Sequence, residues 1–250
     1  MTVTVGVSLK MYFGYERARE WFGQVAEVAR ANEAVANGEV ELFIIPSFVS
    51  IPAAVDALAG TRVAVGSQDL FWEDDGAYTG EVSGAELAEA GVTVAEVGHA
   101  ERRRIFAETE TIVAAKTAAA LRNGITPVLC IGELERQPAD SAALEVVAQL
   151  ASALNGAPAG RVIVAYEPVW AIGAAEPADA DHIRVVCKWL RSAIANLGHE
   201  GSSVIYGGSA GPGLLTELGS EVDGLFLGRF AHDTTALAQV LDEAAKVARQ

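Results

Sequence analysis

Eight short runs rich in β-branched residues recur along this chain of 250 residues, and a segment that can form a helix follows nearly every run. Runs of this length that are apolar on both faces are typical of parallel strands covered by helices. The candidate strands are residues 3–8, 40–46, 62–66, 92–98, 126–130, 161–166, 203–208 and 224–228. This alternation constrains the fold more than any other feature of the sequence.

The connecting segments carry the apolar spacing of amphipathic helices. The clearest examples are residues 17–32, 142–154, 181–197 and 235–248, and each is long enough for several helical turns. Strand and helix therefore alternate eight times, which predicts the α/β class and a closed (β/α)8 barrel. An open doubly wound sheet is the alternative. No linker rich in Pro, Ser or Gly divides the chain, so we expect a single domain over residues 1–250.

The charge balance limits the classes of partner. The net charge of −15 and the pI near 4.6 repel phosphate backbones and anionic lipids, and no basic patch opposes that field. We therefore expect binding to neither nucleic acid nor membrane. The chain starts without a secretory leader, and the two cysteines, Cys130 and Cys187, cannot form a disulfide framework. We expect a cytoplasmic protein.

Polar residues at the carboxyl ends of the predicted strands are the candidates for chemistry, because that end of a barrel carries the active site. Lys10, one of only four lysines, ends the first strand, and its ammonium can neutralise an anion. His99 precedes a predicted helix start, which favours a neutral imidazole. Glu167 follows four apolar residues, and partial desolvation makes such a carboxylate a candidate general base.

Two glycine-containing turns follow the last two predicted strands. The first carries Ser209 after a Gly-Gly pair, and the second is Gly228-Arg229. Backbone N–H groups in such turns can approach an oxyanion, and the last two units of a barrel commonly bind phosphate. No cluster of His, Cys, Asp and Glu has the spacing of metal ligands. We therefore expect a phosphate-binding site and no metal.

Five segments, taken together, resemble triosephosphate isomerase: Lys10, VGHAERR at 97–103, CIGE at 130–133, AYEPVWAIG at 165–173 and YGGS at 206–209. The resemblance covers nearly the whole chain in order. It implies a homodimeric TIM barrel without cofactor, an aldose-ketose isomerase that acts on a small phosphosugar through an enediolate. In that family, Glu167 would shuttle a proton, His99 would act as a neutral electrophile and Lys10 would stabilise substrate charge, a pairing for which this enzyme is the standard example.

The resemblance also implies roles for further residues. Residues 168–178 correspond to the mobile lid of the family, and Gly173 and Ser209 correspond to phosphate-binding positions. Glu101 matches a further carboxylate of the active site. Glu133 matches a residue that supports the lid.

Several positions depart from the family pattern. Ser8 stands where Asn is usual, and Ala100 stands where Ser is usual. The lid ends in AAEPA at 174–178 in place of a Gly-Lys-Thr type of sequence, which adds negative charge and stiffens the hinge. Gly228-Arg229 replaces a Gly-Gly pair, and the Arg229 guanidinium could bind phosphate or point to solvent. These changes leave more room around the substrate.

GLFLGR at 224–229 and QDLFWEDDGAYTGE at 68–81 resemble the paralogues that isomerise an erythrulose phosphate, of the L-erythrulose 1-phosphate type. A triosephosphate isomerase acting on dihydroxyacetone phosphate and glyceraldehyde 3-phosphate is the alternative. A non-catalytic barrel that binds phosphorylated ligands and a lyase that uses Lys10 as a Schiff base are remote alternatives. The joint presence of Lys10, His99 and Glu167 disfavours both.

The segment from Ser67 to Gly80 is long for a connection between a strand and a helix. It carries three aromatic side chains that are costly to expose, Phe71, Trp72 and Tyr78. We therefore expect this loop to insert into a partner chain. The resemblance implies that Thr79 approaches Ser8 and Lys10 of the other subunit of a homodimer.

Overall fold

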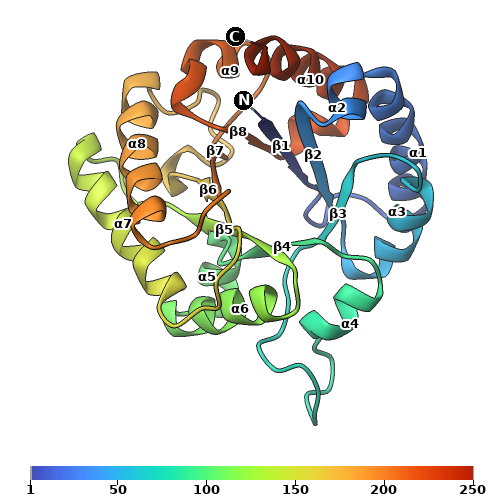
Figure 1. The fold of residues 1–250 in the computed structure, drawn as a ribbon, viewed down its shortest axis with the longest axis horizontal. Helices are drawn as coiled ribbons and strands as arrows, with labels where there is room; N and C mark the ends of the chain where they lie inside the picture. Colours follow the sequence, from blue (N-terminus) through green and yellow to red (C-terminus); the bar gives the residue numbers. More distant parts are fainter. Residues whose placement is uncertain (1, 250) are drawn as a thin grey trace.

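Eight parallel strands close into a barrel within a ring of helices in the computed structural model, which describes residues 2–249 (Figure 1). The strands are β1 (Val3–Ser8), β2 (Val40–Ile45), β3 (Ala64–Ser67), β4 (Val94–Val97), β5 (Thr126–Ile131), β6 (Ile163–Tyr166), β7 (Ser203–Tyr206) and β8 (Gly224–Leu227). They pair in chain order, and β8 pairs with β1. The predicted (β/α)8 barrel is confirmed. The doubly wound sheet is wrong, because an open sheet would leave its edge strands unpaired.

The helices form the outer layer. They are α1 (Tyr15–Ala31), α2 (Glu33–Asn37), α3 (Ile51–Ala57), α4 (Gly84–Glu89), α5 (Ala100–Phe106), α6 (Glu110–Arg122), α7 (Ala139–Leu154), α8 (Ala180–Asn196), α9 (Leu214–Leu218) and α10 (Thr234–Ala248). Short 3₁₀ helices are η1 (Phe48–Ser50), η2 (Val169–Ala171), η3 (Gly219–Glu221) and η4 (Arg229–His232). The four predicted long helices correspond to α1, α7, α8 and α10. Within residues 2–249, no helix is long and apolar enough to cross a membrane.

Some predicted strands are shorter in the structure, three of them at the amino end and four at the carboxyl end. β6 begins at Ile163 and not at Arg161, because the Arg161 guanidinium turns to the Glu41 carboxylate on β2. β3 and β4 likewise begin two residues later than predicted. Apolar composition alone therefore predicts strands that are longer than those in the structure.

The barrel interior is filled by alternate residues of the strands. A largely apolar cluster occupies it, formed by Phe43, Ile45, Val94, Val128, Cys130, Ile163, Ala165, Ile205 and Phe226. The Phe43 ring lies over Gly6, where a Cβ would be only 2.1 Å from the ring. Glycine at position 6 is therefore what allows this large side chain to fill the barrel.

Four buried or partly buried charged side chains hold the start of the loop after β3 against α5 and α6. The Lys116 ammonium lies 2.6 Å from an oxygen of Asp69 and 2.5 Å from an oxygen of Glu108. The Arg102 guanidinium contacts the same two carboxylates, at 2.8 Å and 2.5 Å. Two cations and two anions thus compensate one another in an ion-pair network that we call the Lys116 network.

The loop over residues 67–80 extends away from the ring of helices (Figure 1). Its Phe71 is buried, and the Phe71 ring packs against the rings of Trp72 and Tyr78 with centroids 4.1 Å and 4.7 Å apart. Phe71 is therefore covered within its own loop, and the insertion of this loop into a partner chain stays a prediction. Tyr78 remains exposed near the loop tip.

Candidate active site

One cavity of about 720 Å³ opens at the carboxyl ends of the strands. Every site residue expected from the sequence lines it, namely Ser8, Lys10, His99, Glu101, Glu167, Gly173, Ser209, Gly228 and Arg229. These residues come from five different strand ends, and the barrel brings them together because all its strands point the same way. Ala100 does not line this cavity, so the departure at that position gives the ligand no additional room.

Lys10 enters the cavity from a strained backbone. Its φ of 47° lies in the left-handed region, which is uncommon for a residue with a side chain. The Gln68 side-chain amide donates to the Lys10 carbonyl at 2.9 Å and holds this turn. Burial alone would lower the pKa of Lys10, but the carboxylates of Glu167, Glu101 and Glu96 raise it above its ordinary value. The side chain is therefore a cation aimed at the cavity.

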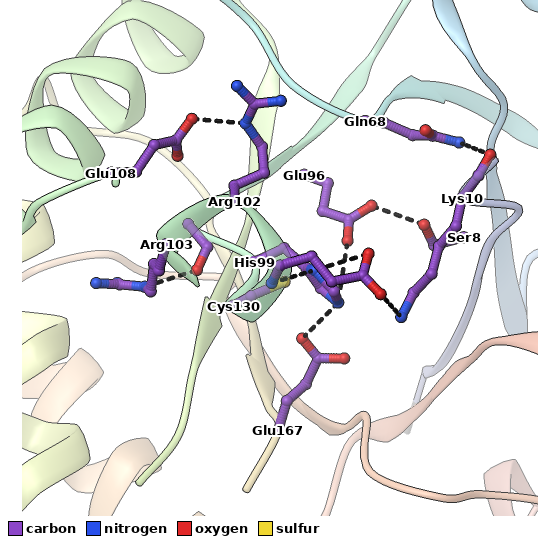
Figure 2. Close-up of polar contacts among 12 residues, drawn as sticks. Ser8, Lys10, Gln68, Glu96, His99, Arg102, Arg103, Glu108, Cys130 and Glu167 are labelled. Carbon is purple, nitrogen blue, oxygen red and sulfur yellow. Dashed lines mark hydrogen bonds and ion pairs between the residues drawn. The ribbon is translucent and has the colours of Figure 1, made fainter. Parts of the chain in front are cut away.

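His99 caps the amino end of α5. Its Nδ1 accepts a hydrogen bond from the Glu101 backbone N–H at 3.2 Å, so Nε2 is the ring nitrogen left to donate to a ligand. Nε2 lies 3.8 Å from Oε2 of Glu167 (Figure 2). The imidazole can therefore donate from Nε2 to an oxygen placed between the two side chains.

Glu167 follows β6 directly and is almost entirely buried. Its backbone N–H donates to the Ile131 carbonyl at 2.8 Å. Gly207 passes so close that a Cβ there would lie 2.7 Å from Cγ of Glu167. Oε2 is buried and has no hydrogen-bond partner among the described residues. A fixed carboxylate with one free oxygen at the cavity is suited to accept a proton from a ligand.

Cys130 lies on the inner face of β5 near Glu167 and Glu96. Burial, and then the neighbouring carboxylates of Glu167 and Glu96, raise the pKa of this thiol well above its ordinary value. Cys130 therefore stays a neutral thiol. It shields Glu167 from solvent without adding charge.

The lid, residues 168–178, lies over the cavity and is bonded to the turn after β7. The Ser209 hydroxyl donates to the Ala174 carbonyl at 2.6 Å, and the Ser209 N–H donates to the Ala171 carbonyl at 3.3 Å. The Ala178 N–H donates to the Tyr206 hydroxyl at 2.9 Å. The Ser209 hydroxyl therefore donates its hydrogen bond to the lid. Ser209 also lines the end of the cavity that is proposed to bind phosphate.

The first part of the lid rests on a buried carboxylate. Glu133 accepts hydrogen bonds from the Trp170 indole at 2.8 Å and from the Tyr166 hydroxyl at 3.1 Å. His182 on α8 lies 3.3 Å from the same carboxylate. The sequence identified only Glu133 as a residue that supports the lid. Tyr166 and His182 are identified as its partners only in the structure, where β6 and α8 pack together.

Arg229 lies at the cavity rim, on η4. Its guanidinium carbon is 5.8 Å from the centre of the Tyr12 ring, and both side chains are exposed and line the cavity. The arginine therefore neither penetrates the cavity floor nor turns away from it. It forms part of the rim next to the Gly228 turn.

Glu96 is a residue that the sequence analysis missed. It lies on the inner face of β4, only 3% exposed, and accepts a hydrogen bond of 2.8 Å from the Ser8 hydroxyl (Figure 2). Burial, reinforced by the Glu167 carboxylate, raises its pKa against the opposing effects of His99, Ser8 and Lys10. A carboxylate in the middle of the apolar run VTVAEVG was the signal that could have identified it.

Comparison with known proteins matches residues 3–244 to the family model described as triosephosphate isomerase. L-erythrulose-1-phosphate isomerase of Pectobacterium atrosepticum is 49% identical to this chain, covering 99% of the chain and 98% of the relative. L-erythrulose-1-phosphate isomerase of Rhizobium etli is 36% identical, with 96% and 92% coverage. Triosephosphate isomerase of Moorella thermoacetica is 37% identical, with 93% and 95% coverage. Together with the closed barrel, these matches show that the chain belongs to the triosephosphate isomerase family.

Proposed function

We propose that this protein isomerises L-erythrulose 1-phosphate by moving a proton between its two central carbons. The observation that carries the chemistry is the pairing of two side chains: Glu167, a buried carboxylate with a free oxygen, and His99, whose Nε2 lies 3.8 Å from that oxygen. The 49% identity to an L-erythrulose-1-phosphate isomerase over nearly the full length supports the substrate.

In this mechanism Glu167 removes the proton from C3 of the substrate, and the electron pair moves into the C2 carbonyl to give an enediolate. His99 donates a hydrogen bond from Nε2 to the developing oxyanion, and the Lys10 cation stabilises the same charge. The hydroxyl proton on O3 passes to O2, and the proton on Glu167 returns to C2, which leaves the carbonyl at C3. No atom enters or leaves, so the reaction needs no cofactor for balance. The lid excludes water while the enediolate exists.

The product follows from the carbon skeleton. In a triose phosphate this transfer converts a ketose into an aldose, because the outer carbon becomes an aldehyde. In L-erythrulose 1-phosphate the corresponding carbon, C3, carries a hydroxymethyl group, so the same transfer gives erythrulose 4-phosphate, a second ketose phosphate. The two substrates therefore differ in the class of product but not in the chemistry at Glu167.

The product can be identified by NMR after reaction in D₂O. We expect L-erythrulose 1-phosphate to be converted into erythrulose 4-phosphate, with deuterium at the carbon that receives the proton from Glu167. The Glu167→Gln variant serves as the control for uncatalysed exchange. Unchanged substrate after prolonged incubation with the wild-type protein would contradict the proposed function.

Arg229 contributes to the choice between substrates in this proposal. Its guanidinium lies at the rim next to Tyr12 and Gly228, where it can shift the resting position of a phosphate group. We expect Arg229→Gly to lower the ratio of kcat/KM for L-erythrulose 1-phosphate over dihydroxyacetone phosphate by about tenfold, the lower end of what one pocket contact contributes. Steady-state assays with both substrates measure this ratio. Arg229→Lys keeps the positive charge but not the planar guanidinium, so it separates the effect of charge from the effect of shape. An unchanged ratio in Arg229→Gly would show that Arg229 does not contribute to the choice between the two substrates.

We further propose a homodimer formed through the loop over residues 67–80, because Tyr78 and Thr79 are exposed on a segment that extends from the barrel. Light scattering at assay concentration should give twice the chain mass of 26.1 kDa. Thr79→Arg should shift the protein toward a monomer with reduced turnover, because a long cation would be buried in the interface. Thr111→Arg, on the exposed face of α6, is the matched control. A fully active wild-type monomer would contradict the dimer.

A cytoplasmic location remains part of the proposal. Cys130 and Cys187 are both free and buried in the barrel, as is usual for proteins of a reducing compartment. Fractionation of cells that produce this protein would test it directly.

A further inference from the structure

Glu96 places a carboxyl group in a layer of the barrel that is otherwise largely apolar. Val94 precedes it on the same face of β4, and Val128 and Cys130 face it from β5. Burying a carboxyl group costs free energy, and a well-packed apolar side chain is usually at least as stabilising at such a position. The stability of the barrel therefore gives no reason for a glutamate here, and a functional reason has to come from its contacts.

The hydrogen bond between Ser8 and Glu96 crosses the barrel. Ser8 ends β1 and Glu96 lies on β4, and these strands are not neighbours in the barrel. Ser8 lines the cavity, whereas Glu96 is not among the lining residues. Figure 2 shows the two side chains meeting next to His99. The pair thus lies at the cavity wall, with Ser8 as the member that lines the cavity.

Ser8 keeps hydrogen-bonding capacity after its bond to Glu96. A serine hydroxyl donates one hydrogen bond and accepts up to two. Ser8 Oγ donates its proton to Oε2 of Glu96 at 2.8 Å, so its lone pairs stay available to accept a hydrogen bond from a ligand hydroxyl group. Glu96 therefore fixes which way the Ser8 hydroxyl points.

The place of this hydroxyl matches one group of the proposed substrate. The phosphate turns follow β6, β7 and β8, and Glu167 and His99 bracket the two carbons that exchange the proton. A substrate whose phosphate lies at these turns and whose two central carbons lie between Glu167 and His99 would carry C4 on the side away from the phosphate, where Ser8 lines the cavity. Dihydroxyacetone phosphate ends one carbon earlier and has no hydroxymethyl group to place there.

Building on the proposed function, we propose that Ser8 and Glu96 form the subsite for the terminal hydroxymethyl group of L-erythrulose 1-phosphate. Ser8 contacts the hydroxyl of that group, and Glu96 is a positioning residue that orients Ser8. The pair acts as a unit, so removing either partner has nearly the same effect as removing both.

The test compares Ser8→Ala, Glu96→Val, Glu96→Gln and the double variant Ser8→Ala/Glu96→Val. For each, kcat/KM is measured with L-erythrulose 1-phosphate and with dihydroxyacetone phosphate, and the readout is the ratio of the two. Ser203→Ala removes a buried hydroxyl at the opposite end of the barrel and is the matched control. Thermal unfolding of each variant shows whether it is folded.

We expect the ratio to fall by about 10–200-fold in Ser8→Ala and in Glu96→Val, the range for one group in a pocket. The double variant should fall no further. Glu96→Gln should keep the ratio within about threefold of wild type, because its amide oxygen can still accept the hydrogen bond from Ser8.

Equal losses with both substrates, or a loss in Glu96→Gln as large as in Glu96→Val, would overturn the subsite. Its failure differs from failure of the proposed function: wild-type protein that does not convert L-erythrulose 1-phosphate overturns both. Wild-type protein that converts it, with variants whose ratio is unchanged, overturns the subsite alone.

Discussion

Replacing Glu167 with Gln is expected to lower kcat by about 10²–10⁴, the usual contribution of a general base. Oε2 of the carboxylate is buried and has no hydrogen-bond partner among the described residues, and an amide in place of the carboxylate can remove no proton. The substitution is nearly isosteric, and the backbone hydrogen bond to Ile131 remains. The fold and substrate binding should therefore survive, and KM should change much less than kcat.

Steady-state kinetics with L-erythrulose 1-phosphate, together with thermal unfolding, check this result. Glu200→Gln makes the same chemical change at an exposed position just before β7, at the other end of the barrel, and should behave as wild type. Turnover within threefold of wild type in Glu167→Gln would remove Glu167 from the role of base.

Replacing Lys116 with Met is expected to lower the free energy of unfolding by about 3–5 kcal/mol, the cost of breaking a buried ion pair. Lys116 is 3% exposed and compensates Asp69 and Glu108, which are also buried. Without its ammonium, the single guanidinium of Arg102 faces two carboxylates. Methionine keeps most of the volume, so the loss reports the missing charge and not a cavity.

Urea unfolding at one fixed protein concentration measures this effect, since assembly also stabilises the folded state. Lys188→Met on α8 is the matched control, because Lys188 is exposed, and such changes usually stay within about 0.5 kcal/mol. A loss in Lys116→Met no larger than in the control would show that the Lys116 network does not stabilise the fold.

The barrel and the set of cavity residues were predictable because both follow from local patterns. Each strand appears as a short apolar run, and a closed parallel barrel gathers whatever follows each run at one end. Lys10, His99 and Glu167 could therefore be placed together from the sequence, although they are far apart along the chain. The position of His99 immediately before a helix was also predictable, and α5 begins at the next residue.

The contacts that depend on packing were not predictable. The Ser8–Glu96 bond joins strands that are not neighbours, and Lys116 reaches Asp69 from a helix 47 positions away. The two residues of each pair lie too far apart in the sequence for any local pattern to predict their contact. The burial of Phe71 by its own loop was not predicted for the same reason. The hydrophobicity of an aromatic side chain indicates that it is buried, but not which residues bury it.

The central claim is that this member of the triosephosphate isomerase family acts on a four-carbon ketose phosphate. The most direct test is kcat/KM of the wild-type protein for L-erythrulose 1-phosphate and for dihydroxyacetone phosphate, measured side by side under the same conditions. We expect the first value to exceed the second by about 10–200-fold, since one hydroxymethyl group in a pocket contributes about 1–3 kcal/mol. A higher value for dihydroxyacetone phosphate would contradict this and identify an ordinary triosephosphate isomerase.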